Sequence, residues 1–289
     1  MDVITTVRAM QDWSDAARWR GQRIGLVPTM GYLHHGHISL VTEARRQAAA
    51  TVASIFVNPL QFGANEDLAR YPRDVARDTR LLTEAGTDVL FLPDVAEMYP
   101  EGFQTTVTVE RVTQGLCGAS RPTHFRGVTT VVAKLFNMVK PDVAVFGRKD
   151  YQQLVTIQRM VRDLNFDIEI VGAPIVREAD GLAMSSRNAY LSAPERAAAL
   201  CLSKALQAAQ ASVERGETDA RRILATARAL IDAEPLAQLD YATLADPETL
   251  DEVSAVDGAA LLALAASVGK TRLIDNAILR RESRVRSSQ

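Results

Sequence analysis

The stretch from Val27 to His37 holds residue types and spacings that suit phosphate chemistry. His34 and His37 lie three residues apart, where a short glycine-bearing loop is expected to enter a helix. A helix N-terminus presents unpaired N–H groups and the positive end of its dipole, so it attracts anions. Two imidazoles there can donate hydrogen bonds to phosphate oxygens, and Gly31 and Gly36 let backbone approach a ligand closely. The pattern predicts a nucleotide triphosphate site of the His-x-Gly-His type.

Two other interpretations of this histidine pair stay open. Histidines at this spacing can be ordinary surface residues. The spacing would also place two zinc ligands on one helical face, and a zinc site then needs at least one more ligand. The chain has no Cys-x-x-Cys or His-Glu-x-x-His pattern, and the ligands it offers instead are His35, His124, Cys117, Cys201 and carboxylates. Because the apolar run Ile24–Val27 predicts a strand before the loop, the strand–loop–helix context favours phosphate.

A second candidate segment, Phe146–Gln153, follows an apolar run and opens a predicted helix. Gly147 allows close approach of backbone to a ligand, and Lys149 supplies a compact positive charge for phosphate. Gln153 lies one helical turn further on, beside Lys149 and Asp150. A charged loop at a strand end is more often simply solvated, so this segment is weak evidence when taken alone.

A third segment, Met184–Arg187, lies in a predicted loop, Glu178–Ala189, at the join between two domains. Ser185 and Ser186 offer hydroxyls and Arg187 a guanidinium, so this hinge loop could close over a triphosphate and release it. A helix cap or a solvated loop would use the same residues.

Two further segments carry amides and cations. Asn58 and Gln61 follow a predicted strand, and their amides offer donors and acceptors without charge, as binding of a hydroxylated acid requires. Turn chemistry at the Asn-Pro step is the competing explanation for Asn58. The segment Cys117–Gly127, with Arg121 and His124, could bind anions or form a subunit interface, and we favour the interface.

Composition is that of a soluble enzyme of about two domains. The chain has 289 residues, of which 47% are hydrophobic and 24% charged. Its net charge of −2 gives no general attraction to nucleic acid or to an anionic membrane. Cys117 and Cys201 cannot make a disulfide framework, which fits the cytoplasm. Residues 1–22 lack the apolar core of a signal peptide, and no apolar run approaches membrane-spanning length.

The elements that would position these residues alternate between strand and helix over the first 175 residues, which predicts a doubly wound parallel sheet. An alternating stretch, Thr105–Val109, suggests an extra edge or dimer strand. The expected strands are Arg23–Pro28, Thr51–Asn58, Asp88–Leu92, Asp142–Gly147 and Asp167–Val171. The expected helices are Gly36–Ala50, Arg73–Gly86, Val128–Val139 and Tyr151–Leu164. Such a sheet binds its ligand beyond the carboxyl ends of its strands.

Residues 176–289 are expected to form a smaller α+β domain at the C-terminus. Their pattern predicts two amphipathic helices, then strands joined by a turn at Gly269-Lys270, then a polar, frayed tail, Glu282–Gln289. The alanine-rich segment Ala259–Val268 could also be a helix. The helices expected are Pro194–Gly216 and Asp219–Ala233, and the strands are Gln238–Ala245, Ala259–Val268 and Arg272–Leu279.

Taken together, these segments resemble the pantothenate synthetase family. The resemblance is dense from about residue 23 to residue 190 and thinner through Leu239–Tyr241 and Thr271–Asn276. The motifs that carry it lie in Pro28–His37, Phe56–Gly63, Gly118–Gly127, Gly147–Gln153 and Arg177–Asn188. The chain departs from the family pattern at variable positions, Tyr32 and His35, and at Arg148, where an acidic residue is common.

The resemblance implies ATP-dependent joining of pantoate and β-alanine to pantothenate through a pantoyl adenylate, with Mg²⁺, in a homodimer. It also implies a Rossmann-like domain joined to a smaller C-terminal domain. The near-neutral charge predicts no nucleic-acid or membrane partner. Another nucleotidyltransferase of the His-x-Gly-His type is the alternative. The catalytic residues implied are His34, His37 and Lys149. The substrate-binding residues implied for pantoate are Gln61, Gln153 and Asn58; no metal ligands are assigned. The ATP-binding residues implied are Met30, Gly31, His34, Gly36, His37, Gly147, Arg148, Lys149, Asp150, Val176, Met184, Ser185, Ser186 and Arg187.

Overall fold

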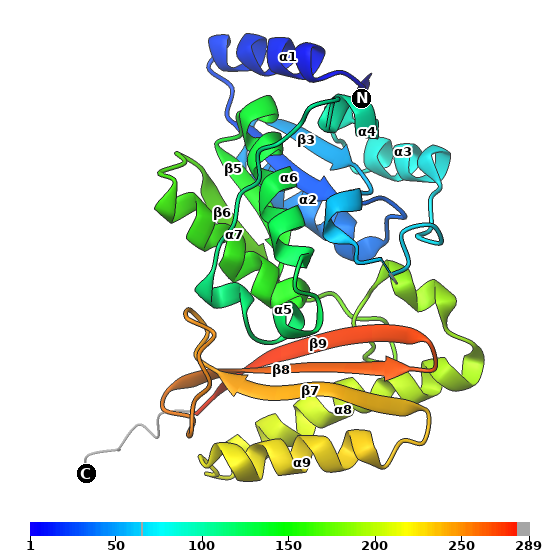
Figure 1. Ribbon diagram of the computed structural model, residues 1–289, viewed down its shortest axis with the longest axis vertical. Coiled ribbons are helices and arrows are strands. Elements are labelled where there is room, and N and C mark those ends of the chain that lie inside the picture. The colour runs from blue at the N-terminus through cyan, green and yellow to red at the C-terminus, as the bar shows by residue number, and fades with distance from the viewer. Residues whose placement is uncertain (65, 282–289) are drawn as a thin grey trace. The chain divides into compact units, whose positions relative to one another are not determined.

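The computed structural model describes residues 1–64 and 66–281, which form two compact units (Figure 1). Unit 1 comprises Met1–Gln114 and Gly118–Val176, and unit 2 comprises Gly115–Cys117 and Arg177–Gln289. The division falls one residue beyond the boundary expected between residues 175 and 176. Whether each unit folds alone, as the term domain implies, stays a prediction.

Unit 1 is built on a six-stranded sheet in which every neighbouring pair of strands is parallel. The spatial order is β1-β4-β3-β2-β5-β6. The chain therefore runs outward from β2 through β3 to β4, and then returns to place β5 on the other side of β2. This confirms the predicted doubly wound parallel sheet. The strands are β1 (Asp2–Ile4), β2 (Ile24–Thr29), β3 (Ala50–Ile55), β4 (Val89–Phe91), β5 (Val143–Gly147) and β6 (Glu169–Ala173).

Helices cover both faces of this sheet, and its four central strands, β2, β3, β4 and β5, are largely buried. Neighbouring residues of β2, Leu26 and Val27, belong to different hydrophobic clusters, as the alternation of side chains along a strand requires. One cluster includes side chains of α1, α6 and α7, and the other includes side chains of α2 and α3. Strands buried in this way read as continuous apolar runs, which is why the sequence located them.

The four helices predicted in unit 1 all form and differ from the prediction mainly at their ends, whereas the helix Val7–Trp19 was not predicted. The α-helices are α1 (Val7–Trp19), α2 (His35–Gln47), α3 (Val75–Glu84), α4 (Val95–Met98), α6 (His124–Val139) and α7 (Tyr151–Asp163), and α5 (Cys117–Ser120) begins on a residue of unit 2. Short 3₁₀ helices are η1 (Pro59–Gln61), η2 (Arg111–Thr113) and η3 (Arg148–Asp150). Helix α6 begins four residues before the predicted start at Val128.

The edge strand predicted at Thr105–Val109 is wrong, since the structure gives these residues no strand, and a strand that pairs only in a dimer stays a prediction. Threonine side chains of α6 take the backbone bonds that a neighbouring strand would otherwise make. The Val107 N–H donates to Thr130 Oγ1 at 3.0 Å, and Thr129 Oγ1 donates to Val107 O at 2.6 Å. The alternating pattern therefore marks an extended segment packed along a helix.

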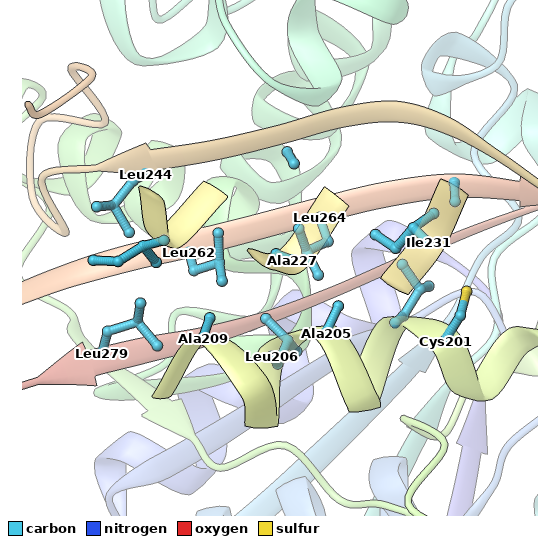
Figure 2. Close-up of a cluster of buried hydrophobic side chains, with 14 of the residues drawn as sticks. Cys201, Ala205, Leu206, Ala209, Ala227, Ile231, Leu244, Leu262, Leu264 and Leu279 are labelled. Atoms are coloured by element: carbon cyan, nitrogen blue, oxygen red, sulfur yellow. The ribbon is translucent and has the colours of Figure 1, made fainter. Parts of the chain in front are cut away.

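Unit 2 packs two helices against a three-stranded antiparallel sheet, which confirms the predicted α+β unit. The alanine-rich segment is a strand, β8, and the Gly269-Lys270 turn links it to β9. Figure 2 shows small side chains such as Ala205 and Ala209 of α8 in the same cluster as Leu264 of β8. The elements are η4 (Ser186–Tyr190), α8 (Ala193–Glu214), α9 (Ala220–Asp232), β7 (Ala237–Ala245), β8 (Ala259–Val268) and β9 (Thr271–Arg280).

Two expectations concern the chain ends and membranes. The tail expected to be frayed, Glu282–Gln289, lies outside the described residues. Within the residues that are described, none of the helices is both long and apolar enough to cross a membrane.

Candidate active site

The sheet order of unit 1 places the ends of β2 and β5 side by side. These two strands are hydrogen-bonded neighbours, and Gly25 of β2 lies opposite Val143 of β5. The chain leaves β2 toward β3 on one side and returns to β5 on the other, so this is the point where the strand order reverses. In doubly wound sheets, ligands bind beyond the carboxyl ends of the strands at such a point. His34 and His37 follow β2, and Lys149 follows β5.

A buried carboxylate from α3 shapes the loop between β2 and α2. Asp78 is 1% exposed and accepts two backbone hydrogen bonds, from Tyr32 N at 2.6 Å and from Leu33 N at 2.8 Å. Gly31 has a φ of 83°, and a Cβ there would come within 3.0 Å of the Ile55 side chain. Glycine at this turn therefore lets the loop pass close to β3 in a left-handed conformation.

His34 and His37 are joined through backbone and ring nitrogens where α2 begins. The Gly36 N–H donates to His34 Nδ1 at 3.1 Å, and the His34 N–H donates to His37 Nδ1 at 3.3 Å. A backbone N–H can only donate, so both Nδ1 atoms accept and each neutral ring carries its proton on Nε2. His34 itself caps the helix, and the Gly36 N–H expected to face a phosphate is bonded to that ring instead. Nε2–H is therefore the donor that each of these neutral rings can offer to a ligand.

The electrostatic surroundings keep His37 neutral. Burial lowers the pKa of His37 well below its ordinary value, and the charges of His34 and Lys149 lower it further. The two rings lie 4.0 Å apart between centroids. His37 therefore offers a phosphate a neutral N–H donor, and Lys149 supplies the positive charge within electrostatic reach of that donor.

The segment after β5 is a single 3₁₀ turn that leads into α7. Lys149 is mostly buried, with 19% of its side chain exposed, and its Nζ lies 4.0 Å from an oxygen of Asp150. Arg148 is exposed and lies over Gly172, where a Cβ would meet its Nε at 3.3 Å. The burial of Lys149 next to the β2 loop distinguishes it from a simply solvated charge.

The predicted amides after β3 lie in different surroundings. Gln61 is 8% exposed, and its Nε2 donates to Met30 Sδ at 3.0 Å, so it reaches the loop that follows β2. Asn58 is 1% exposed and lies three residues beyond the end of β3, where it donates to Gln61 Oε1 at 3.0 Å. Gln153 is half-buried in the first turn of α7. The structure brings Met30, Gln61 and Asn58 together.

The segment Arg121–His124 faces the interior of unit 1. Arg121 makes a two-bond ion pair with Glu66, with distances of 2.8 and 2.5 Å. His124 Nδ1 lies 2.9 Å from the backbone oxygen of Gln61, and a second donor to that oxygen is Arg121, at 3.3 Å. The interface role that we favoured for this segment stays a prediction, and these two side chains have partners within the unit.

In unit 2, ion pairs join residues on both sides of the Met184–Arg187 segment. Arg177 pairs with Asp275 at 2.6 and 2.9 Å, and Arg196 bonds Glu178 and Asp180, each at 2.7 Å. Within the segment itself, Ser185 Oγ accepts from Arg187 N at 3.2 Å and caps η4, and Ser186 is 8% exposed. The helix-cap explanation therefore holds for Ser185, while its hydroxyl proton can still donate to an anion.

Side chains that could bind a metal are scattered in the part of the chain that the structure describes. Nowhere in residues 1–64 and 66–281 do three or more His, Cys, Asp or Glu side chains gather so that they could hold a metal ion. Both cysteines are free and buried, without a disulfide between them.

Comparison with known proteins decides the family. The family model described as pantoate-beta-alanine ligase matches residues 2–278. The chain belongs to this family. The pantothenate synthetase of Syntrophobacter fumaroxidans is 61% identical over 280 residues, covering 97% of this chain and 99% of that protein. The one from Syntrophus aciditrophicus is 56% identical over 286 residues, covering 99% of this chain and all of that protein.

Solved structures of the ligase family share the fold. Pantothenate synthetase from Thermus thermophilus superposes with a TM-score of 0.91 at 48% identity, covering 96% of this chain and 99% of that one. Pantoate-beta-alanine ligase from Francisella tularensis, solved in complex with beta-gamma ATP and beta-alanine, gives a TM-score of 0.81 at 31% identity, covering 98% of each chain.

Asp78 was missed in the sequence, although it anchors the loop that carries the ligase family's histidine motif. Its position held a signal, because Asp78 lies four residues before the buried Leu82 and therefore on the apolar face of α3. An acidic residue on an apolar face requires a hydrogen-bond partner inside the protein.

The neutral state of His124 predicts a pH dependence of stability. Burial lowers the pKa of His124 to about 4, from an ordinary value of 6.5. Between these two pH values the unfolded chain binds a proton that the folded chain does not, so the free energy of unfolding falls as the pH drops from 6.5 toward 4. We expect His124→Gln to reduce this fall by about 1.4 kcal/mol per pH unit at most. Urea unfolding at several pH values measures it, and an unchanged slope would contradict the assignment.

Proposed function

We propose that the chain catalyses the ATP-dependent condensation of pantoate with β-alanine to give pantothenate, AMP and pyrophosphate. The chain belongs to the pantoate-beta-alanine ligase family, and one observation of its structure supports the proposal most directly. The neutral donor His37 lies within electrostatic reach of the buried cation Lys149, where the strand order of the sheet reverses. The Francisella relative, solved with beta-gamma ATP and beta-alanine, supports the choice of nucleotide and amine.

The first step transfers AMP to the acid. A carboxylate oxygen of pantoate attacks the α-phosphorus of ATP, and pyrophosphate leaves with the electrons of the broken P–O bond. The attacking carboxylate is already ionised, so this step needs no general base. Negative charge builds on the α-phosphate and on the departing pyrophosphate, and preorganised donors stabilise such charge most effectively. His34 and His37 would donate through Nε2–H, and Lys149 would supply a full charge.

In the second step, the amine of β-alanine attacks the carbonyl carbon of the acyl adenylate. AMP leaves, and an amide bond forms. This order explains why a phosphate site must lie beside a separate site for the acid. Gln61 lies next to Met30 of the phosphate loop, which supports its role in holding pantoate there.

The ATP-binding assignments are proposals of the same kind. In unit 1 they lie at the ends of β2, β5 and β6. They comprise Met30, Gly31, His34, Gly36, His37, Gly147, Arg148, Lys149, Asp150 and Val176. In unit 2 they rest on the family motif and comprise Met184, Ser185, Ser186 and Arg187. Gln61 and Gln153 are proposed for the pantoate site, whereas the amide of Asn58, which the sequence also suggested for it, is fully bonded within the protein.

We also propose Mg²⁺ as the companion of ATP. Mg²⁺ keeps several waters and binds mainly through substrate phosphates, so it requires few protein ligands. That preference fits a described chain that gathers no cluster of metal-binding side chains. The ion would offset phosphate charge. A homodimer and a cytoplasmic location are further proposals, which rest on the family resemblance and the two free cysteines.

An assay that omits one substrate at a time tests the function. Pantothenate and AMP should form in equal amounts only when ATP, pantoate and β-alanine are all present. Another nucleotidyltransferase of the His-x-Gly-His type would release pyrophosphate with a different acceptor and would make no pantothenate. That outcome would overturn the proposal.

Gln153→Ala should weaken the binding of pantoate and leave the binding of ATP unchanged. The side chain is uncharged and half-buried in the first turn of α7, four residues after the cationic Lys149. Each buried polar group left unpaired costs ~1–3 kcal/mol, which corresponds to roughly a 5- to 150-fold loss of affinity. Calorimetric titration measures both ligands, with the exposed neighbour Gln158→Ala as the control. Loss of ATP affinity with normal pantoate binding would reverse the assignment.

A further inference from the structure

The Asn58 side chain has no hydrogen-bonding capacity left for a ligand. Its Nδ2 donates to Gln61 Oε1 and to Gly127 O, each at 3.0 Å. Its Oδ1 accepts from Leu60 N at 3.3 Å and from the Tyr99 hydroxyl at 2.8 Å. An asparagine amide has two hydrogens and two acceptor lone pairs, so these four bonds use all of them. With 1% of the residue exposed, Asn58 is a bonded part of the interior.

Two of these four partners fix which way the Asn58 amide points. Gly127 O can only accept, and Leu60 N can only donate, because both are backbone groups. The nitrogen of Asn58 must therefore face Gly127, and its oxygen must face Leu60. The same nitrogen also faces Gln61, so the Gln61 atom that it meets is the oxygen, Oε1. The Gln61 nitrogen must then point the other way, where it lies 3.0 Å from Met30 Sδ.

The first turn of α6, together with Arg121 just before it, holds the Gln61 backbone in the position that this orientation requires. His124 Nδ1 and Arg121 both donate to Gln61 O, at 2.9 and 3.3 Å. A Cβ on Gly127 would come within 2.3 Å of Leu60 O and 2.5 Å of Gln61 N. Only glycine at residue 127 therefore lets η1 pack this closely against α6. This packing brings the Gly127 carbonyl oxygen within hydrogen-bonding distance of Asn58.

We propose that Asn58 and the first turn of α6 set the hydrogen-bond polarity of Gln61, so that Gln61 presents Nε2–H to the acid substrate. Asn58 is then a positioning residue that does not touch pantoate, which revises its predicted role in substrate binding. The thioether of Met30 is a weak acceptor, so the Nε2 hydrogens are available to a stronger one. The group of the acid that meets Gln61 must be a carboxylate oxygen or a hydroxyl lone pair. This inference rests on the proposed function for the identity of the acid.

A double-mutant cycle on the pantoate KM distinguishes positioning from direct contact. Asn58→Ala should raise this KM roughly 10- to 100-fold when Gln61 is intact. In the Gln61→Ala background the same change should alter it by no more than about twofold, since the residue acts only through Gln61. The ATP KM should stay near the wild-type value in all three variants. Equal effects in both backgrounds would overturn the proposal, because they would show an independent contact with the substrate.

Gln61→Glu tests the polarity itself. Its ionised carboxylate would accept from Asn58 but could not donate to the acid, whereas its protonated form could do both. Relative to wild type, the pantoate KM of this variant should therefore fall as the pH is lowered from about 8 toward 5.5. If Gln61 instead accepts a hydrogen bond from the substrate, the ionised variant should bind at least as well at high pH, and the trend would vanish or reverse.

A spectroscopic test needs no substrate, so its result does not depend on whether the proposed function is correct. In a ¹H–¹⁵N spectrum, the Gln61 side-chain amide signal is identified by its loss in Gln61→Ala. Asn58→Asp removes the donor to Gln61 Oε1 and should shift or broaden that signal, and Tyr99→Phe should shift it less. A Gln61 signal that is unmoved in Asn58→Asp would refute the coupling even in a protein that makes pantothenate. A coupled pair in a protein without that activity would refute only the function.

Discussion

Replacement of His37 or Lys149 by alanine should slow adenylate formation by about 10²–10³ at saturating ATP and pantoate. Removal of one preorganised donor from a site of charge development has this size of effect in other enzymes. Both groups are placed to act on charge that appears in the transition state, so kcat and kcat/KM should fall together. Single-turnover formation of enzyme-bound adenylate is the measurement.

The chain offers matched controls for both substitutions. His35 is an exposed histidine in the same turn of α2, and His35→Ala should leave the rate near wild type. Lys149→Arg should restore only part of the rate, because a planar guanidinium does not replace a compact ammonium at a mostly buried position. If His37→Ala or Lys149→Ala forms the adenylate at the normal rate, that residue is not catalytic.

Asp78→Ala should destabilise unit 1 and disrupt the histidine loop. The change leaves the N–H groups of Tyr32 and Leu33 without their acceptor, at a cost of about 1–3 kcal/mol for each buried group. The free energy of unfolding should therefore fall by about 2–6 kcal/mol. The loop cannot readily recover these bonds elsewhere, because Gly31 and Tyr32 already adopt left-handed conformations.

Denaturant unfolding and ATP titration together measure this effect. Asp78→Asn keeps one acceptor oxygen and should lose less stability than Asp78→Ala. Asp74→Ala removes an exposed acid from the same helix and costs only a helix cap, about 1 kcal/mol. If Asp78→Ala unfolds at the wild-type denaturant concentration, the carboxylate does not anchor the loop.

The sequence located the residues whose position follows from one local rule. A strand that ends in a glycine-bearing loop and opens a helix places its polar residues beyond the carboxyl end of that strand, and the structure places His34, His37 and Lys149 there. Their mutual proximity depends on the order of the strands. That order was not predictable, because β1 is only three residues long and pairs with β4, far along the chain.

Asn58 shows where local rules fail. Its type and its place after a strand suggest a ligand contact, but its partners include Gly127, 69 residues further along the chain, and the hydroxyl of Tyr99. Thr105–Val109 fails for a related reason, since its alternation is that of a strand while its bonds go to α6 threonines. In both cases the deciding partner comes from a distant segment, which periodicity and spacing cannot identify.

Exchange of labelled pyrophosphate into ATP tests the central claim, that the protein activates pantoate as an acyl adenylate before the amine reacts. The assay contains the full-length chain, ATP, Mg²⁺, pantoate and labelled pyrophosphate, without β-alanine. We predict exchange that depends on pantoate and falls in His37→Ala and Lys149→Ala but not in His35→Ala. Exchange that appears only when β-alanine is added would contradict the adenylate mechanism.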